Sequence, residues 1–106
     1  MAVEHAADPL AFDRFVQEIK ERYRPEKILL FGSRARGEAS THSDFDVLIV
    51  SSRFAGVPLT DRATPIYRMW PLWGDLDCLC LTPDEFERSR RRISIVREIE
   101  REGVPL

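Results

Sequence analysis

The sequence predicts a small α/β domain in which helices flank a mixed sheet of three or four strands. Three short apolar segments, 27–31, 44–50 and 76–81, have the length and composition of buried strands. Segments whose apolar residues recur at helical spacing precede, separate and follow these strands. The chain has 106 residues, enough for one hydrophobic core, and we expect residues 1–106 to form a single domain.

The first half of the chain carries clear helix signals. An acid followed by proline is a common helix start, so the first helix is predicted to begin at Pro9 with Asp8 as its N-cap, and Pro25 ends it. A further helix lies before the third strand, starting near Thr60 or restarting at Thr64. Pro65 within this segment leaves both starts open.

The second half ends in two helices. Thr82 and Glu85 follow the third strand at the spacing of a capping box, which predicts a helix from there. A last amphipathic helix carries Ile95, Val96 and Ile99, and Gly103 is well placed to end it.

Composition excludes several classes of protein. The formal net charge is −2, which gives the chain as a whole no attraction to nucleic acid, and no apolar run approaches the roughly 20 residues that span a bilayer. The N-terminal residues lack a secretory signal, so we expect a cytoplasmic protein. Cys78 and Cys80 fit neither a redox pair nor a zinc site, and we expect reduced, buried thiols.

Asp44 and Asp46 open the second strand on either side of Phe45. Residues two apart in a strand point to the same face with about 6.6 Å of rise, so both carboxylates aim in one direction. Such a pair repels unless a cation lies between its members, and paired carboxylates suit Mg²⁺ with substrate phosphates. Two such ions stabilise the attacking and leaving oxygens of a phosphoryl transfer.

A third carboxylate is needed to hold a second ion and accept a proton. Asp77 opens the third strand, where it can face a neighbour across the sheet. Asp75 is the competitor, but it directly follows Gly74 and belongs to the preceding turn, so we prefer Asp77.

Gly32 and Ser33 break the first strand, and a brief helix is expected from Arg34 to Gly37. Glycine permits close backbone approach, and the serine hydroxyl with the amides that start a helix can cradle phosphates. Arg34 and Arg36 can neutralise phosphate charge, and we favour Arg36. Each feature alone is common, but their order along the chain is specific.

At these residues the chain resembles a known family. "GSRARGEASTHSDFDVLIV" is similar to the GSxARG…SDxDLxV signature of the minimal nucleotidyltransferases, of the DNA polymerase β-type superfamily, with Val47 in place of the usual leucine. The resemblance implies that fold for the chain. It implies metal-binding and catalytic roles for Asp44, Asp46 and Asp77, and nucleotide binding by Gly32, Ser33, Arg36 and Ser43.

The resemblance further implies transfer of a nucleoside monophosphate from an NTP, with ATP favoured, to a hydroxyl with release of pyrophosphate and two Mg²⁺ ions as cofactors. It implies a small helical partner of the HEPN type, for which such proteins serve as antitoxins. It does not decide whether the chain forms a homo-oligomer or a hetero-oligomer. A binding module with a silent nucleotide site is the alternative. A nucleic-acid-binding domain is a third hypothesis, which the net charge disfavours.

Other conspicuous residues have simpler interpretations. His42 is expected to be an exposed loop histidine. The basic run of Arg88, Arg90, Arg91 and Arg92 lies among glutamates and is expected to form a solvated helix face. An aromatic cluster made of Met69, Trp70, Leu72 and Trp73 either forms a partner-binding patch or caps the core.

Overall fold

A four-stranded sheet in the order β3-β2-β1-β4 forms the centre of the molecule. The structure is a computed structural model that describes residues 9–37, 44–70, 75–92 and 95–106. The strands are β1 (Lys27–Phe31), β2 (Phe45–Val50), β3 (Leu76–Leu81) and β4 (Val104–Pro105). Strand β1 pairs antiparallel with β2 and β4, whereas β2 and β3 are parallel. The mixed sheet is therefore the predicted one, with β2 in its interior.

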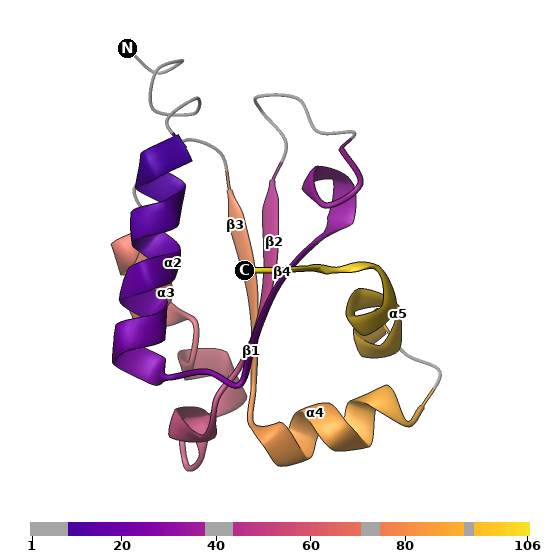
Figure 1. Cartoon of the computed structure of the whole chain (residues 1–106). Helices are drawn as coiled ribbons and strands as arrows, with labels where there is room; N and C mark the ends of the chain where they lie inside the picture. Colours follow the sequence, from indigo (N-terminus) through magenta and orange to yellow (C-terminus); the bar gives the residue numbers. More distant parts are fainter. Residues whose placement is uncertain (1–8, 38–43, 71–74, 93–94) are drawn as a thin grey trace.

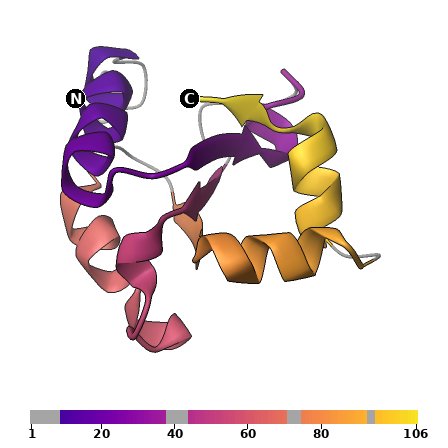
Figure 2. The same ribbon diagram turned by 60° about the horizontal axis from the view of Figure 1, so that its bottom comes forward.

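Helices cover both faces of the sheet, giving three layers (Figure 1). Helices α2 (Pro9–Tyr23) and α3 (Thr64–Met69) lie on one side, and α4 (Pro83–Arg90) and α5 (Ile95–Glu102) lie on the other. Figure 2 shows the same separation from a second direction. Short 3₁₀ turns η1 (Gly32–Arg34), η2 (Ser52–Phe54) and η3 (Leu59–Asp61) lie in the connections.

Two separate hydrophobic cores lie on the two faces of the sheet, and β2 is buried on both sides. Phe45, Val47 and Ile49 pack in the core against α2 and α3. Leu48 and Val50 pack in the other core, which includes residues of α4 and α5. Asp46 shares this second face and is half-buried, so it lies at the end of the strand where the helices no longer cover the sheet.

A partly buried ion pair ties the loop before α3 to the start of α4. Arg62 donates from Nη1 and Nη2 to the two carboxylate oxygens of Glu85, at 2.5 and 3.1 Å. Its Nη1 also donates to the Cys80 carbonyl, and its Nε to that of Val57. The Arg62 guanidinium and hydrogen bonds from Thr82 lower the pKa of Glu85 to about 2. Thr82 and Glu85 form the predicted capping box.

The structure refines several predicted boundaries. The brief helix after β1 begins at Gly32, two residues before the predicted start at Arg34, because the Gly32 carbonyl accepts hydrogen bonds from the amides of Ala35 and Arg36. The helix before β3 begins at Thr64, one of the two predicted starts, after a separate 3₁₀ turn. Strand β4 follows Gly103, where no strand was predicted, since two residues give no alternation to recognise. Asp8 lies outside the described residues.

The cysteines are free thiols, as expected, with their sulfurs 3.5 Å apart. Cys80 is buried, but Cys78 is only partly so, because it faces α3 at the edge of the sheet. The hydrogen bond to Cys80 and burial raise the pKa of Cys78. In the ranges that the structure describes, no helix has the length and apolar character needed to cross a membrane.

Candidate active site

Three aspartates meet at one end of the sheet. Asp46 of β2 lies opposite Asp77 of β3 in the parallel pairing, and the charge of Asp77 acts on the Asp46 carboxyl. Asp44, one residue before β2, is exposed, and its charge also acts on Asp46. Burial, the Asp77 charge and the Asp44 charge raise the pKa of Asp46, in that order. The arrangement concentrates negative charge that a cation would relieve.

The Gly32 turn lies directly against this acidic cluster. Gly32 follows Phe31, which pairs with Asp46 across β1 and β2, and its φ is +75°. A Cβ atom at this position would overlap the Asp46 Oδ2 atom and lie 3.3 Å from its Cγ. Only glycine therefore allows the carboxylate and the turn to approach so closely.

Two of the backbone amides that were predicted to bind a phosphate make hydrogen bonds within the turn instead. The amides of Ala35 and Arg36 donate to the Gly32 carbonyl, at 3.1 and 3.2 Å. These two amides are therefore engaged within the turn itself, and phosphate binding by Gly32 and Ser33 stays a prediction.

The two arginines of the turn lie in different surroundings. The Arg34 guanidinium stacks on the Phe45 ring at 3.6 Å, and its charge interacts with Asp44. Arg36 is exposed and lines a hollow of about 260 Å³ between η1 and α5, with Glu98 opposite. The structure thus brings Arg34 close to the acids, and the nucleotide-binding role of Arg36 stays a prediction.

A second hollow, of about 390 Å³, opens beside the acids at the end of β3. It is lined by Asp44, Tyr67, Trp70, Asp75, Leu76 and Asp77. The register decides which acid of β3 partners Asp46, since Asp77 is its direct neighbour and Asp75 lies outside the strand. Tyr67 and Trp70 were not predicted as site residues, because nothing in their spacing along the sequence relates them to the acids.

A divalent ion is implied by this type of site, and the donor set fits one. Among the described residues, no three His, Cys, Asp or Glu side chains form a ready-made metal group. Asp46 and Asp77 nevertheless supply adjacent carboxylate oxygens, and Mg²⁺ is commonly held by one or two carboxylates plus water and substrate phosphates. Substrate phosphates would then complete the shell.

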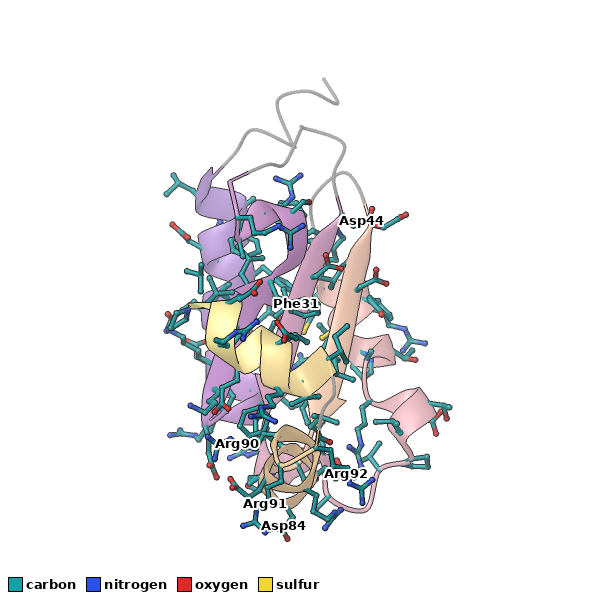
Figure 3. All side chains as sticks on the ribbon, turned by 90° about the vertical axis from the view of Figure 1, so that its right-hand side faces the viewer. Phe31, Asp44, Asp84, Arg90, Arg91 and Arg92 are labelled. Carbon is teal, nitrogen blue, oxygen red and sulfur yellow. The ribbon has the colours of Figure 1, made fainter. Side chains whose placement is uncertain are left out.

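The basic run lies far from the acids. Figure 3 places Arg90, Arg91 and Arg92 at the end of the molecule opposite Asp44. Arg90 pairs with Glu87 and Glu100, and Arg91 with Glu87, which confirms a solvated charged face.

The structure describes two of the four residues of the aromatic cluster. Trp70 and Met69 pack against the α2 core, as the core-capping interpretation requires. Trp73, Leu72, His42 and Ser43 lie outside the described residues.

The mixed sheet, with a glycine turn set against aspartates from neighbouring strands, defines an α/β protein of the nucleotidyltransferase type. The sequence profile of the nucleotidyltransferase domain family matches residues 12–67, more than half of the chain, and the chain belongs to this family. The match includes Gly32, Ser33, Asp44 and Asp46 and ends before Asp77. It confirms the family resemblance found in the sequence.

Known proteins agree with this assignment. The chain is 50% identical over 42 residues to a "Putative protein adenylyltransferase" of Methanocaldococcus jannaschii, an alignment that covers 38% of this chain and 42% of that protein. A solved "putative nucleotidyltransferase" of Sulfolobus solfataricus is 25% identical with a TM-score of 0.63, over 98% of this chain and 84% of the other. BolA1 of Arabidopsis thaliana, 22% identical with a TM-score of 0.56 over 71% of this chain and 94% of the other, shares the fold alone.

Proposed function

We propose that the protein transfers AMP from ATP to a hydroxyl group of a protein acceptor and releases pyrophosphate. The observation that carries the proposal is the position of the Asp46 carboxylate, between the Gly32 turn and Asp77. Membership of the nucleotidyltransferase domain family supports the reaction type. The name of the M. jannaschii relative supports AMP as the transferred group and a protein as the acceptor.

The two sides of the site have different tasks in this proposal. Gly32, Ser33 and Arg36, with Ser43, bind the phosphates of the nucleotide. Asp44, Asp46 and Asp77 hold two Mg²⁺ ions. When bound, these ions neutralise phosphate charge and stabilise the attacking and leaving oxygens of the transfer.

The transfer makes one bond and breaks one. The acceptor oxygen attacks the α-phosphorus of ATP, the bond from that phosphorus to the bridging oxygen of the β-phosphate breaks, and pyrophosphate leaves with the bonding electrons. The hydroxyl proton passes to Asp77. A carboxylate held beside the accepting hydroxyl suits this task, because proton transfer needs hydrogen-bond reach.

The resemblance to the minimal nucleotidyltransferases supports a more specific acceptor, a small helical protein of the HEPN type. In that case the chain acts as an antitoxin by modifying its partner. Expression of the partner alone and together with this chain tests the role, with growth of the host as the readout.

Incubation with ATP labelled at the α-phosphate, Mg²⁺ and the candidate partner tests the reaction. Label should enter the partner with the wild-type chain and be lost with Asp44→Asn combined with Asp46→Asn. Asp61→Asn combined with Asp84→Asn is the matched control, since it removes the same charge from exposed positions. Labelling that persists in the first double variant refutes the assignment. A wild-type chain that binds its partner without labelling it favours a silent binding module.

A further inference from the structure

The hollow beside β3 has a chemical character of its own. The described residues that line it include three aspartates, Asp44, Asp75 and Asp77, and two aromatic residues, Tyr67 and Trp70. We propose that this hollow binds the acceptor polypeptide and selects a lysine or arginine next to the accepting hydroxyl. This inference rests on the proposed transfer reaction.

The sheet order separates the two substrates. Gly32, where we place the phosphates, follows β1, whereas the hollow lies at β3, and β2 runs between them. A triphosphate entering the hollow would meet the exposed carboxylate of Asp75, which has no part in the proposed metal binding. The nucleotide therefore approaches from the β1 side and the acceptor from the β3 side, where its hydroxyl reaches Asp77.

Packing against the core holds one side of the aromatic wall. The Trp70 ring makes edge contacts with Phe12, Phe15 and Phe45, at centroid distances of 6.2, 4.8 and 4.9 Å. Tyr67 is 44% exposed beside it. A cation placed over such rings gains attraction that adds to the charge of nearby carboxylates.

The charges around the hollow leave Asp75 available for an incoming cation. Arg34 lies on the Phe45 ring, and its charge interacts with Asp44. The proposed metal ions take up charge from Asp77. Asp75 belongs to neither arrangement: among the residues that the structure describes, its recorded hydrogen bond is the one that its backbone carbonyl accepts from the Phe45 amide, at 2.9 Å.

Backbone pairing with the edge of β3 is a less suitable mode of recognition. Strand β3 is terminal in the sheet, but its outward Cys78 amide donates to the Tyr67 hydroxyl at 3.4 Å. Its Cys80 carbonyl accepts from Arg62 at 3.1 Å. An added strand would have to break both contacts, so recognition falls to side chains at the open end of β3.

Fluorescein-labelled peptides test the inference by direct binding, without ATP or metal. Each peptide carries one serine, flanked by arginine in one set, glutamine in a second and glutamate in a third. Fluorescence polarisation at fixed ionic strength should show the arginine set binding at least about tenfold more tightly than the other two. Asp75→Asn and Tyr67→Ala should each weaken this binding about tenfold, whereas Tyr67→Phe keeps the ring and most of the affinity.

Asp84→Asn is the matched control because it removes the same charge at the end of the molecule opposite Asp44 (Figure 3). It should leave binding of the arginine set unchanged. Equal affinity for the three sets, or an equal loss in Asp84→Asn and Asp75→Asn, overturns the inference. If the wild-type chain labels all sets with equal kcat/KM, selection of a basic acceptor fails and nucleotidyl transfer stands. If the arginine set binds as described but receives no AMP, the transfer reaction fails and the docking site stands.

Discussion

The Oδ2 atom of Asp46 lies so close to Gly32 that no side chain fits between them. This contact joins the end of β1 to the start of β2, at the position where Phe31 pairs with Asp46. The lack of a side chain at Gly32 therefore sets how closely the turn approaches the Asp46 carboxylate. In the proposed function, this contact couples phosphate binding at the turn to metal binding by the acids.

Gly32→Ala should abolish AMP transfer in a folded protein, because the new Cβ displaces the Asp46 carboxylate. Gly56→Ala is the control: Gly56 has a similar φ, of +82°, but nothing lies within 4 Å of an added Cβ. Both changes should cost about 1 kcal/mol of unfolding free energy, since alanine is strained at positive φ. Urea unfolding and incorporation of labelled AMP measure the two effects. Equal activity of the two variants would show that the contact is unimportant.

Arg36→Gln should raise the KM for ATP about tenfold if Arg36 contacts a phosphate, which corresponds to one charge-assisted hydrogen bond of about 1.4 kcal/mol. Arg97→Gln is the matched change at an exposed arginine of α5. Steady-state kinetics with varied ATP distinguish them. An unchanged KM in Arg36→Gln would remove Arg36 from the site and leave Arg34, which the structure holds near Asp44, as the arginine to test next.

The Arg62–Glu85 pair should make stability depend on acid pH. The pKa of Glu85 is lowered from 4.5 to about 2, so the pair stabilises the fold fully above the pKa of the unfolded chain. This stabilisation is lost as the pH falls from about 4.5 through about 2. We expect a loss of about 2 kcal/mol, less than the pKa change alone implies, since the Glu85 side chain is 30% exposed.

Glu85→Gln isolates this contribution. Its unfolding free energy should change less with pH over the same range than that of the wild type, as measured by urea unfolding. Glu21→Gln, at an exposed position of α2, is the matched control. Identical pH profiles for the wild type and Glu85→Gln would contradict the assigned role of the ion pair.

Local signals in the sequence were sufficient for most of the fold. Apolar runs predicted β1, β2 and β3, and the spacing of Thr82 and Glu85 predicted the start of α4. Strand β4 was missed because its two residues are held by pairing with Leu29 and Leu30, which is a tertiary effect. The turn at Gly32 was predicted, but the brief helix within it was placed two residues late, at Arg34, since hydrogen bonds to the Gly32 carbonyl close it.

The candidate site was predictable as a list of residues but not as an arrangement. Alternation along the expected strand 44–50 predicted that Asp44 and Asp46 share a face, although β2 itself begins at Phe45. The pairing of Asp46 with Asp77 depends on the register of two parallel strands, which no local pattern specifies. The stacking of Arg34 on Phe45 arises only when η1 packs beside β2, and the wall formed by Tyr67 and Trp70 only when α3 packs beside the end of β3.

The kcat of Asp77→Asn for transfer of labelled AMP is the most direct test, because Asp77 lies beyond the matched family region and owes its place to the register alone. We predict a kcat at least about 100-fold below that of the wild type, with an unchanged circular dichroism spectrum and normal activity in Asp84→Asn. A kcat for Asp77→Asn within about twofold of the wild-type value would contradict the claim that acids from β2 and β3 act together.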